Sequence, residues 1–339
     1  MRKVRLGKTG LLVSKTSFGA LPIQRIPESE STKILRRAYE AGINFFDTAQ
    51  FYTDSEAKIG TALSDVRENI VIATKSATDS AEFVQRNLDN SLKMMKTDYI
   101  DIYQLHNPAE LPNDDIWEVL FRAKEQGKIR HIGITNHRAK LAMEAIKTGL
   151  FETLQFPFCI LSGEAEHELV RECAARDIGF IAMKAMSGGL ITSARAAFAF
   201  LDQYPTVVPI YGVQKMEELE EFIALEANPP VMSEELLSEI EEQKQGLSGD
   251  FCRGCGYCMP CPVGIEINQA ARMSLMIGRA PYQQFVGKEW RQKMDLIKNC
   301  LECGHCKAHC PYGLDTPNLL KRELERYDKL YAELHVEED

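Results

Sequence analysis

The sequence predicts a two-domain α/β protein, in which a (β/α)8 TIM barrel precedes a smaller, mainly α-helical module. Over the first 225 residues, short apolar or β-branched runs alternate with amphipathic helical stretches. The last quarter of the chain contains eight of its ten cysteines. With 339 residues, 45% of them hydrophobic and 26% charged, the chain can build one large core and a smaller second one.

Eight short runs have the length and composition of buried strands. They cover residues 16–19, 43–47, 70–74, 100–105, 131–135, 153–157, 179–183 and 207–211. Between them the apolar positions change to helical spacing, as in Phe83, Val84, Leu88 and Leu92. The first run is not followed by G-x-G-x-x-G, the turn of dinucleotide-binding sheets, so a closed barrel is favoured over a doubly wound sheet.

Two segments flank the predicted barrel. Residues 4–13, with Lys8-Thr9-Gly10 at their centre, predict a hairpin that closes the barrel floor ahead of the first strand. Pro229-Pro230 and the Glu-rich helical stretch 234–244 mark the other end. We therefore expect a barrel domain over residues 1–245 and a helical domain over residues 246–339.

The charge balance narrows the classes of partner. A net charge of −9 argues against nucleic-acid binding, which needs clustered Lys and Arg to neutralise phosphates. Residues 1–14 lack the apolar run of a secretory signal, and no stretch has the length of a membrane span. We expect a cytoplasmic protein with no nucleic-acid or membrane partner.

The cysteines form two runs with the spacing of iron–sulfur ligands. The first run is Cys252-x-x-Cys255-x-x-Cys258-x-x-Cys261-Pro262, and the second is Cys300-x-x-Cys303-x-x-Cys306-x-x-x-Cys310-Pro311. Three thiolates two residues apart surround one face of a cubane, and the cysteine before the proline reaches the other cluster in a two-cluster ferredoxin. The runs therefore predict two 4Fe-4S clusters and electron transfer.

Other uses of cysteine compete with this interpretation. Structural zinc also takes C-x-x-C pairs, but in two pairs rather than in runs of three followed by Cys-Pro. Disulfide frameworks belong to short secreted chains without a core, and Cys159 and Cys173 are expected to be buried thiols. The first run has two residues before its fourth cysteine where the standard pattern has three. This leaves open whether the second cluster is a full cubane or lacks one iron.

Polar side chains follow the carboxyl ends of three predicted strands, where the chemistry of such barrels takes place. Asp47, Lys75 and His106 end these strands, and Tyr52 lies in the loop after Asp47. Taken singly, each has a structural explanation, such as a helix cap, a solvent-exposed lysine or a satisfied core histidine. Together they predict an acid–base centre, because an ammonium beside a phenol stabilises its phenolate and lowers its pKa. Asp47 would balance the charge of Lys75, and His106 would orient a substrate oxygen.

These residues and their settings resemble the aldo-keto reductase family from about residue 2 to about residue 225. The matching motifs are Asn44-Phe-Phe-Asp-Thr-Ala, Ala73-Thr-Lys, Asp101-Ile-Tyr-Gln-Leu-His-Asn-Pro and Gly133-Ile-Thr-Asn-His137. The resemblance implies reversible hydride transfer between NAD(P)H and an aldehyde or ketone, with Asp47, Tyr52, Lys75 and His106 as the catalytic residues.

The same resemblance implies a nicotinamide-nucleotide site along the later strands. Its residues are Thr135, Asn136 and Gln155 at the carboxamide, Met183 against the ring, and Ser187, Gly189, Tyr211, Gly212 and Gln214 toward the pyrophosphate and adenosine. Met183 stands where many family members stack a tyrosine, and a thioether orients the ring less rigidly. Glu218 stands where the family often places a cation for the 2′-phosphate of NADP, which favours NADH, although Lys215 could compensate.

The cysteine-rich segment resembles the helical ferredoxin modules of dehydrogenases and the tail of the iron–sulfur branch of the aldo-keto reductases. Between Cys261 and Cys300 lie 38 residues, with expected helices over residues 269–277 and 281–298. The resemblance implies that Cys252, Cys255, Cys258 and Cys310 bind one cluster and that Cys300, Cys303, Cys306 and Cys261 bind the other.

Three functions are compatible with these features. In the first, the chain is an NAD(P)H-dependent reductase of a small-molecule carbonyl, and the clusters have a separate role. In the second, a ferredoxin or another redox partner supplies electrons through the clusters to the barrel site. In the third, the clusters sense redox state or stabilise a binding protein, which a complete set of catalytic residues disfavours. A nicotinamide transfers two electrons and a cluster transfers one, so direct coupling normally needs an intermediate such as a flavin.

The substrate pocket is expected at the barrel mouth with a mixed apolar and aromatic lining. Its predicted lining residues are Leu21, Phe51, Trp117, His137, Phe158 and Met186. The sequence does not identify the substrate beyond a carbonyl or an alcohol.

Overall fold

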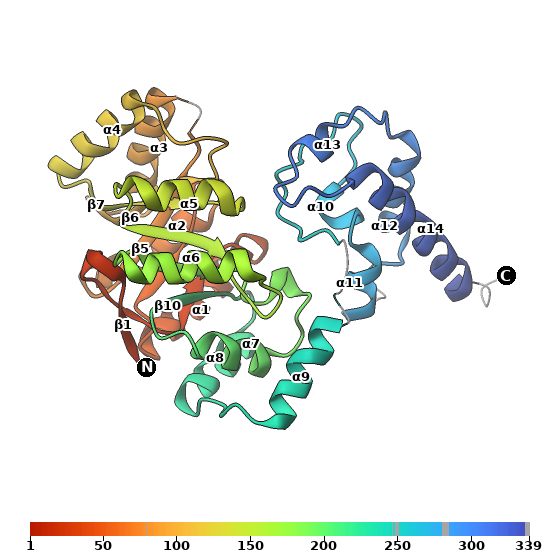
Figure 1. The fold of residues 1–339 in the computed structure, drawn as a ribbon, viewed down its shortest axis with the longest axis horizontal. Coiled ribbons are helices and arrows are strands. Elements are labelled where there is room, and N and C mark those ends of the chain that lie inside the picture. Colours follow the sequence, from red (N-terminus) through yellow and green to blue (C-terminus); the bar gives the residue numbers. More distant parts are fainter. Residues whose placement is uncertain (79, 246, 248–250, 280–284, 336–339) are drawn as a thin grey trace. The chain divides into compact units, whose positions relative to one another are not determined.

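The computed structural model describes residues 1–78, 80–245, 247, 251–279 and 285–335. The chain forms two compact units: Met1–Met186 with Ser193–Ile240, and Ser187–Thr192 with Glu241–Asp339. The first unit is a barrel with helices on its outside, and the second is mainly helical (Figure 1). The domain boundary that we expect at residue 245 stays a prediction.

Eight parallel strands close the barrel in the order β10-β3-β4-β5-β6-β7-β8-β9. They are β3 (Ser17–Gly19), β4 (Phe45–Asp47), β5 (Val71–Ser76), β6 (Ile100–His106), β7 (Ile129–Thr135), β8 (Thr153–Pro157), β9 (Gly179–Met183) and β10 (Val207–Gly212). Each strand overlaps one of the eight runs predicted from the sequence. The predicted (β/α)8 barrel is therefore confirmed.

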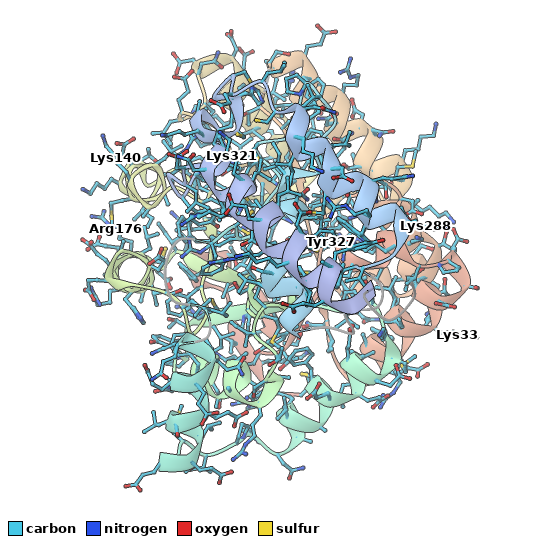
Figure 2. All side chains as sticks on the ribbon, turned by 90° about the vertical axis from the view of Figure 1, so that its right-hand side faces the viewer. Lys33, Lys140, Arg176, Lys288, Lys321 and Tyr327 are labelled. Carbon is cyan, nitrogen blue, oxygen red and sulfur yellow. The ribbon has the colours of Figure 1, made fainter. Side chains whose placement is uncertain are left out.

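Helices cover the outside of the barrel. They are α1 (Glu28–Glu40), α2 (Ser55–Leu63), α3 (Ala81–Met94), α4 (Asp114–Glu125), α5 (Ala139–Thr148), α6 (Glu164–Ala175), α7 (Ala194–Asp202) and α8 (Met216–Ala227). Short 3₁₀ segments are η1 (Gly7–Thr9), η2 (Pro22–Arg25), η3 (Ser64–Asn69) and η4 (Ser187–Gly189). The helices bury an apolar stripe, such as Val84 and Leu88 on α3, and expose charged side chains such as Lys33 and Lys140 (Figure 2).

The N-terminal hairpin closes the amino-terminal end of the barrel, as predicted. β1 (Lys3–Arg5) pairs antiparallel with β2 (Leu12–Ser14). Leu6 and Val13 are fully buried in a cluster with the strand residues Phe45, Ile102, Ile181 and Val208. Gly7 adopts φ +51°, and a Cβ there would lie 2.3 Å from the backbone nitrogen of Gly179. The turn therefore needs glycine for both its conformation and its close approach to β9.

The second unit is built from short helices around the cysteine runs. Its elements are the end of α9 (Glu234–Gln245), α10 (Ile267–Ala270), α11 (Met273–Arg279), α12 (Lys288–Asp295), η6 (Leu296–Asn299), α13 (His305–Ala308) and α14 (Thr316–His335). Its core packs apolar residues such as Ile265, Leu320 and Tyr327 with the thiols of Cys252, Cys258 and Cys306. The predicted helix over residues 281–298 begins in residues outside those described.

Within the described residues, none of the helices combines the length and the apolar composition that a membrane crossing requires.

We predict that Leu6→Ala destabilises the protein by about 2–5 kcal/mol, because it leaves a cavity in a fully buried floor. Leu12→Ala, in the same hairpin but 59% exposed, is the control and should change the stability by less than about 0.5 kcal/mol. Urea denaturation followed by circular dichroism would measure both. Equal effects would contradict the role of Leu6 in closing the barrel.

Candidate active site and cysteine pockets

Four polar side chains meet at the carboxyl-terminal rim of the barrel. Asp47 is the last residue of β4, Lys75 lies near the end of β5, and His106 is the last residue of β6. Tyr52 follows Asp47 in the loop before α2. Because β4, β5 and β6 are neighbours and all run in parallel, their last residues share one edge of the barrel.

The centre of this site is a buried ion pair. Nζ of Lys75 lies 2.7 Å from Oδ1 of Asp47 and donates a second hydrogen bond, of 2.6 Å, to the carbonyl of Thr48. Both charged side chains are at most 3% exposed. Burial raises the pKa of Asp47 and lowers the pKa of Lys75, while their mutual attraction opposes both shifts. Each charge depends on the other to remain ionised away from water.

Two buried amides complete the hydrogen bonding of Asp47. Nε2 of Gln155 lies 3.3 Å from Oδ1 of Asp47, and Nε2 of Gln104 lies 3.4 Å from Oδ2. Gln104 also donates to Oε1 of Gln155 at 2.8 Å. We did not predict Gln104 as a site residue. Its signal in the sequence is a polar residue two positions before His106 in a strand that is buried almost throughout.

Tyr52 lies beside the ion pair, but its pKa differs from our expectation. Nζ of Lys75 lies 5.1 Å from the centre of the Tyr52 ring, so the ammonium faces the ring. Burial raises the pKa of Tyr52, and the charge of Asp47 raises it further. The predicted lowering of this pKa by Lys75 is therefore wrong, because burial of the phenol raises the pKa and the Asp47 carboxylate adds to that shift. The phenol is a neutral group that can donate its proton.

His106 is neutral for a similar reason. Burial, and then the charge of Lys75, lower the pKa of His106 to about 3. Its ring meets the Tyr52 ring edge-on at 6.1 Å between centroids. Within the described part of the chain, its buried Nδ1 has no hydrogen-bond partner. The imidazole can therefore hydrogen-bond to a bound polar group.

Glu56 is a second residue that the sequence argument missed. It lies on α2, is buried, and accepts a 2.5 Å hydrogen bond from Oγ1 of Thr74. Burial raises its pKa, whereas its charge favours the protonated form of Lys75. Its position four residues after Tyr52, in the first turn of α2, could have indicated it.

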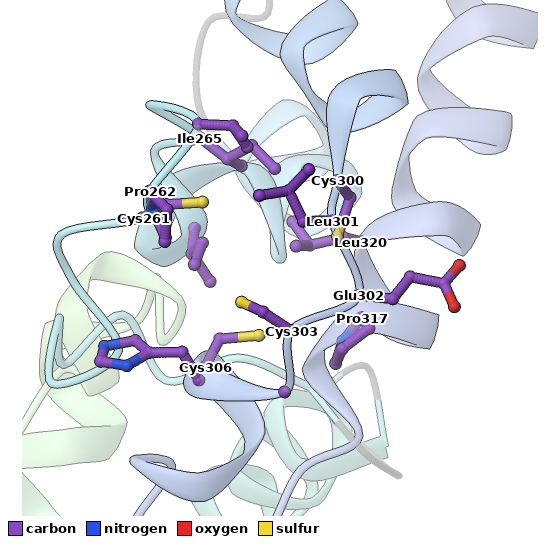
Figure 3. A pocket seen from close by; sticks show the side chains of 14 residues that line it. Cys261, Pro262, Ile265, Cys300, Leu301, Glu302, Cys303, Cys306, Pro317 and Leu320 are labelled. Atoms are coloured by element: carbon purple, nitrogen blue, oxygen red, sulfur yellow. The ribbon is translucent and has the colours of Figure 1, made fainter.

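The eight clustered cysteines separate into two pockets in the second unit. One pocket is lined by Cys252, Cys255, Cys258 and Cys310, together with Arg253, Pro311 and Tyr312. The other is lined by Cys261, Cys300, Cys303 and Cys306 with an apolar surround that includes Pro262, Ile265 and Leu320 (Figure 3). Each run thus supplies three cysteines to one pocket and its fourth to the other.

The pockets have the donors that an iron–sulfur cluster needs. Each presents four thiols in a largely apolar lining, and the backbone N–H of Gly254 lies 3.4 Å from Sγ of Cys252. Burial, and then Cys252 and Cys255, raise the pKa of Cys258 to about 12. A thiolate at this position therefore needs a bound metal cation to stabilise its charge. In the described residues, no three or more His, Cys, Asp or Glu side chains gather as the ligands of a single metal ion would.

Family models match both units. The model described as the Aldo/keto reductase family matches residues 15–197, which is more than half of the chain. The chain belongs to the aldo-keto reductase family. A second model, described as a 4Fe-4S dicluster domain, matches residues 251–315. The resemblance predicted from the strand ends and the cysteine spacing is confirmed.

Relatives and solved structures agree with the family. The chain is 30% identical over 207 residues to the uncharacterised oxidoreductase YqkF of Bacillus subtilis, covering 57% of this chain and 67% of that protein. It is 32% identical over 225 residues to the uncharacterised oxidoreductase YrpG of the same organism, covering 56% and 68%. An aldo-keto reductase from Klebsiella pneumoniae in complex with NADPH shares the fold, with a TM-score of 0.63, 22% identity, and coverage of 71% and 94%. Family membership and these relatives make the chain described here an oxidoreductase.

The residues expected at the nicotinamide carboxamide lie on, or directly after, two neighbouring strands, and Gln155 is the central residue of β8. Thr135 ends β7 beside Gln155 of β8. Oδ1 of Asn136 accepts hydrogen bonds from the backbone of His137 and Arg138, and its Nδ2 donates to the carbonyl of Pro108. Gln155, as described above, is engaged by Asp47 and Gln104. In this state both amides are held by the protein.

The residues expected toward the pyrophosphate and adenosine differ in whether their side chains and backbone groups are exposed or already engaged by the protein. Ser187 and Gly189 lie in η4, where φ is positive, and η4 groups with the second unit. The Tyr211 ring is buried against Phe222 at 4.0 Å between centroids, so this side chain packs the barrel wall. Gly212 ends β10 and is exposed. The backbone N–H of Gln214 donates to Glu218 at 2.8 Å.

The residues predicted to line the substrate pocket differ in their burial, and for the exposed ones the prediction stays a prediction. Leu21 and Phe51 are exposed, and the Phe51 ring lies 6.0 Å from that of His106. Trp117 instead stacks on Phe121 and packs against Phe151, which precedes β8 and so lies toward the opposite end of the barrel. Phe158 is fully buried among the aromatic rings of α6 and α7. Both are core residues, which hydrophobicity alone does not distinguish from a pocket lining. Met183, which we expected against the nicotinamide ring, lies at the end of β9 and packs against the buried cluster that includes Leu6 and Val13.

We predict that Lys75→Met costs about 3–5 kcal/mol of stability, because it leaves the Asp47 carboxylate buried and unpaired. The double variant Asp47→Asn/Lys75→Met should recover much of that loss, since neither charge then remains. Lys128→Met, which breaks the exposed Lys128–Asp89 pair, is the control and should change little. Urea denaturation of the four proteins tests this. A double variant as unstable as Lys75→Met would contradict it.

Proposed function

We propose that the protein is a nicotinamide-dependent carbonyl reductase in which Tyr52 is the general acid and general base. The observation that carries this proposal is the buried Lys75–Asp47 pair beside Tyr52 and His106 at one rim of the barrel. The fit of this rim to a bound substrate is supported by the buried Nδ1 of His106, which has no hydrogen-bond partner among the described residues.

Each residue then has a definite task. Bound NAD(P)H supplies a hydride to the carbonyl carbon of an aldehyde or ketone. Tyr52 donates its hydroxyl proton to the carbonyl oxygen as that oxygen gains negative charge. The Lys75 ammonium, 5.1 Å from the centre of the Tyr52 ring, would stabilise the resulting phenolate until solvent returns the proton. Neutral His106 hydrogen-bonds the same oxygen and orients it, and Asp47 keeps Lys75 charged and in place.

The nucleotide would be held by Thr135, Asn136, Gln155 and Met183 at the nicotinamide end and by Ser187, Gly189, Tyr211, Gly212 and Gln214 at the other. For Tyr211 only the backbone is proposed to take part, because its ring is buried. We further propose a preference for NADH. The support is Glu218, whose carboxylate lies at the backbone of Gln214 and Lys215 and would repel the 2′-phosphate of NADPH.

We propose that the second unit holds two 4Fe-4S clusters. Cys252, Cys255, Cys258 and Cys310 would bind one, and Cys300, Cys303, Cys306 and Cys261 would bind the other. The support is that these two sets of cysteines each line one pocket. When bound, such clusters exchange single electrons.

A second candidate function is electron transfer from a redox partner through the clusters to the barrel site. The observation that favours it is the exposure of Cys303 and of its neighbour Leu301, which is 66% exposed at the edge of its pocket. A one-electron carrier such as a ferredoxin would reach the cluster there. If reduced clusters, followed by EPR, are reoxidised by a carbonyl compound without NAD(P)H, this second function holds. If the clusters stay silent while NAD(P)H is consumed, the first holds.

We predict that Tyr52→Phe lowers kcat for carbonyl reduction by about 10²–10⁴-fold while the affinity for NAD(P)H stays close to normal. The variant removes the proton donor and leaves the proposed nucleotide contacts intact. Tyr103→Phe is the matched control, because its buried hydroxyl donates to the carbonyl of Val84 on α3, one of the helices that cover the outside of the barrel. Steady-state rates over a panel of aldehydes and ketones, with coenzyme binding by fluorescence, test this. Unchanged turnover in Tyr52→Phe would end the assignment.

We predict that anaerobically purified protein is brown and contains about eight iron ions per chain, four for each set of cysteines. Iron and sulfide analysis together with EPR of the reduced protein measures this. About seven irons with a three-iron signal would instead identify an incomplete second cluster. A colourless, zinc-loaded preparation that iron and sulfide do not reconstitute would contradict the cluster proposal.

A further inference from the structure

We propose that Gln104 is a positioning residue that holds Asp47 and Gln155 in one arrangement, and so links coenzyme recognition to proton donation. This inference rests on the proposed function, because it assigns Gln155 to the nicotinamide and Asp47 to the proton-donating group. It concerns a residue that does not itself contact substrate or coenzyme. Its effect is transmitted through the two residues to which it donates.

The geometry places Gln104 between the two halves of the site. It lies on β6 in register with Lys75 of β5, and its side chain is fully buried. One amide nitrogen serves two acceptors, Oε1 of Gln155 at 2.8 Å and Oδ2 of Asp47 at 3.4 Å. Gln155 in turn donates to the other oxygen of Asp47. The three side chains therefore form a closed triangle of hydrogen bonds.

The orientation of the Gln104 amide is determined by its neighbours. Turning the amide over would direct its carbonyl oxygen at the Asp47 carboxylate and at Oε1 of Gln155, and all of these groups are acceptors. In the present orientation, Oε1 of Gln104 is buried and has no hydrogen-bond partner in the described part of the chain. An unsatisfied buried acceptor is costly, so this orientation persists because the two donated bonds outweigh it.

The neighbouring strand leaves little freedom for the side chain to move. A Cβ added at Gly133 on β7 would lie 3.0 Å from Cγ of Gln104 and 2.2 Å from Oγ1 of Thr153. Gln104 thus packs directly against the glycine of the next strand. Packing against Gly133 restricts the Gln104 side chain at Cγ, and the hydrogen bonds to Gln155 and Asp47 fix the position of its amide nitrogen.

The triangle has a consequence for coenzyme binding. The carbonyl oxygen of Gln155 is already used by Gln104, and one of its N–H groups is shared with Asp47. When Gln155 engages a carboxamide, its bond to Asp47 competes with that contact. Gln104 is then the amide that remains on Asp47 and keeps the carboxylate paired with Lys75. An apolar residue at this position could not perform this task.

The test compares Gln104→Met with Thr153→Val in anaerobically purified protein that retains its metal. Methionine matches the length of glutamine but donates no hydrogen bond. Thr153 is the matched control, because it is buried beside the same glycine and its hydroxyl has no partner among the described residues. The readouts are kcat and KM for the best carbonyl substrate, NADH affinity by fluorescence, and Tm, each measured from acid to alkaline pH.

We expect kcat of Gln104→Met to fall about ten-fold or more, which corresponds to one lost hydrogen bond to a charged group. The NADH affinity should also fall, whereas Thr153→Val should match wild type in every readout. The acid limb of the kcat profile should move to higher pH, because removing a donor from a carboxylate raises its pKa. The groups facing Asp47 are Lys75, Tyr52 and Gln155, and those facing Lys75 include Glu56 and His106.

Stability provides a readout that does not depend on turnover. The Tm difference between wild type and Gln104→Met should be largest at neutral and alkaline pH and should shrink toward acid pH. The sign follows because a raised carboxyl pKa makes the folded variant bind more protons than the wild type, so it loses relative stability as pH rises. In Gln104→Glu, which keeps the shape, activity should fall steeply with rising pH as two carboxylates come to face each other.

The outcomes separate this inference from the proposed function. If Tyr52→Phe loses turnover but Gln104→Met has the kcat, pH profile and pH-dependent Tm of wild type, the role of Gln104 is overturned and the reductase stands. A pH-independent Tm loss with an unmoved acid limb also overturns it, since it reveals packing alone. If Tyr52→Phe keeps its turnover, the reductase assignment fails, and the Tm comparison still decides whether Gln104 holds Asp47.

Discussion

The site depends on one constraint, which is that an ammonium and a carboxylate are buried together inside a barrel of apolar strands. Neither Lys75 nor Asp47 could remain charged there alone, because transferring a lone ion from water costs far more than a folded domain can offset. Their 2.7 Å contact is therefore a condition for the rim to carry charge at all. The neighbouring groups adapt to it: His106 is neutral, and Tyr52 keeps its proton.

This constraint gives the ammonium a different role from the one that the sequence suggests. An isolated pair of Lys75 and Tyr52 predicts a phenol of lowered pKa. In the folded protein, burial of the phenol raises its pKa and the Asp47 carboxylate raises it further, so the phenol is protonated at rest. In the proposed reaction, the stabilisation by Lys75 would matter only after the proton has left, when negative charge resides on the phenol oxygen. Such stabilisation acts on the charge that develops during reaction rather than on the resting group.

The barrel was predictable from the sequence because its signals are local. Runs such as residues 153–157 and 179–183 have the length and the largely apolar composition of buried strands, and both are strands with those bounds. The chain order of Asp47, Lys75 and His106 was sufficient to place them together, since parallel strands end on the same rim. The cysteine runs were equally informative, because metal-ligand spacing is written directly into the chain.

The remaining features depend on contacts that no local pattern encodes. Gln104 looked like one polar residue in a buried strand until its two acceptors, 57 and 51 residues away along the chain, were placed around it. Trp117 and Phe158 were assigned to the mouth because aromatic residues serve equally in cores and in pockets. Only their neighbours, such as Phe151 and Phe180, distinguish the two uses.

The exchange of fourth cysteines between the two pockets has a topological consequence. Cys261 leaves its own run to line the pocket of the later cysteines, and Cys310 returns to the pocket of the earlier ones. Two segments about fifty residues apart in the chain therefore meet at both pockets. A cluster bound in either pocket would order a segment that also contributes a cysteine to the other pocket. If clusters bind in both pockets as proposed, filling one pocket would lower the entropy cost of ordering the other, and the two binding steps would be cooperative.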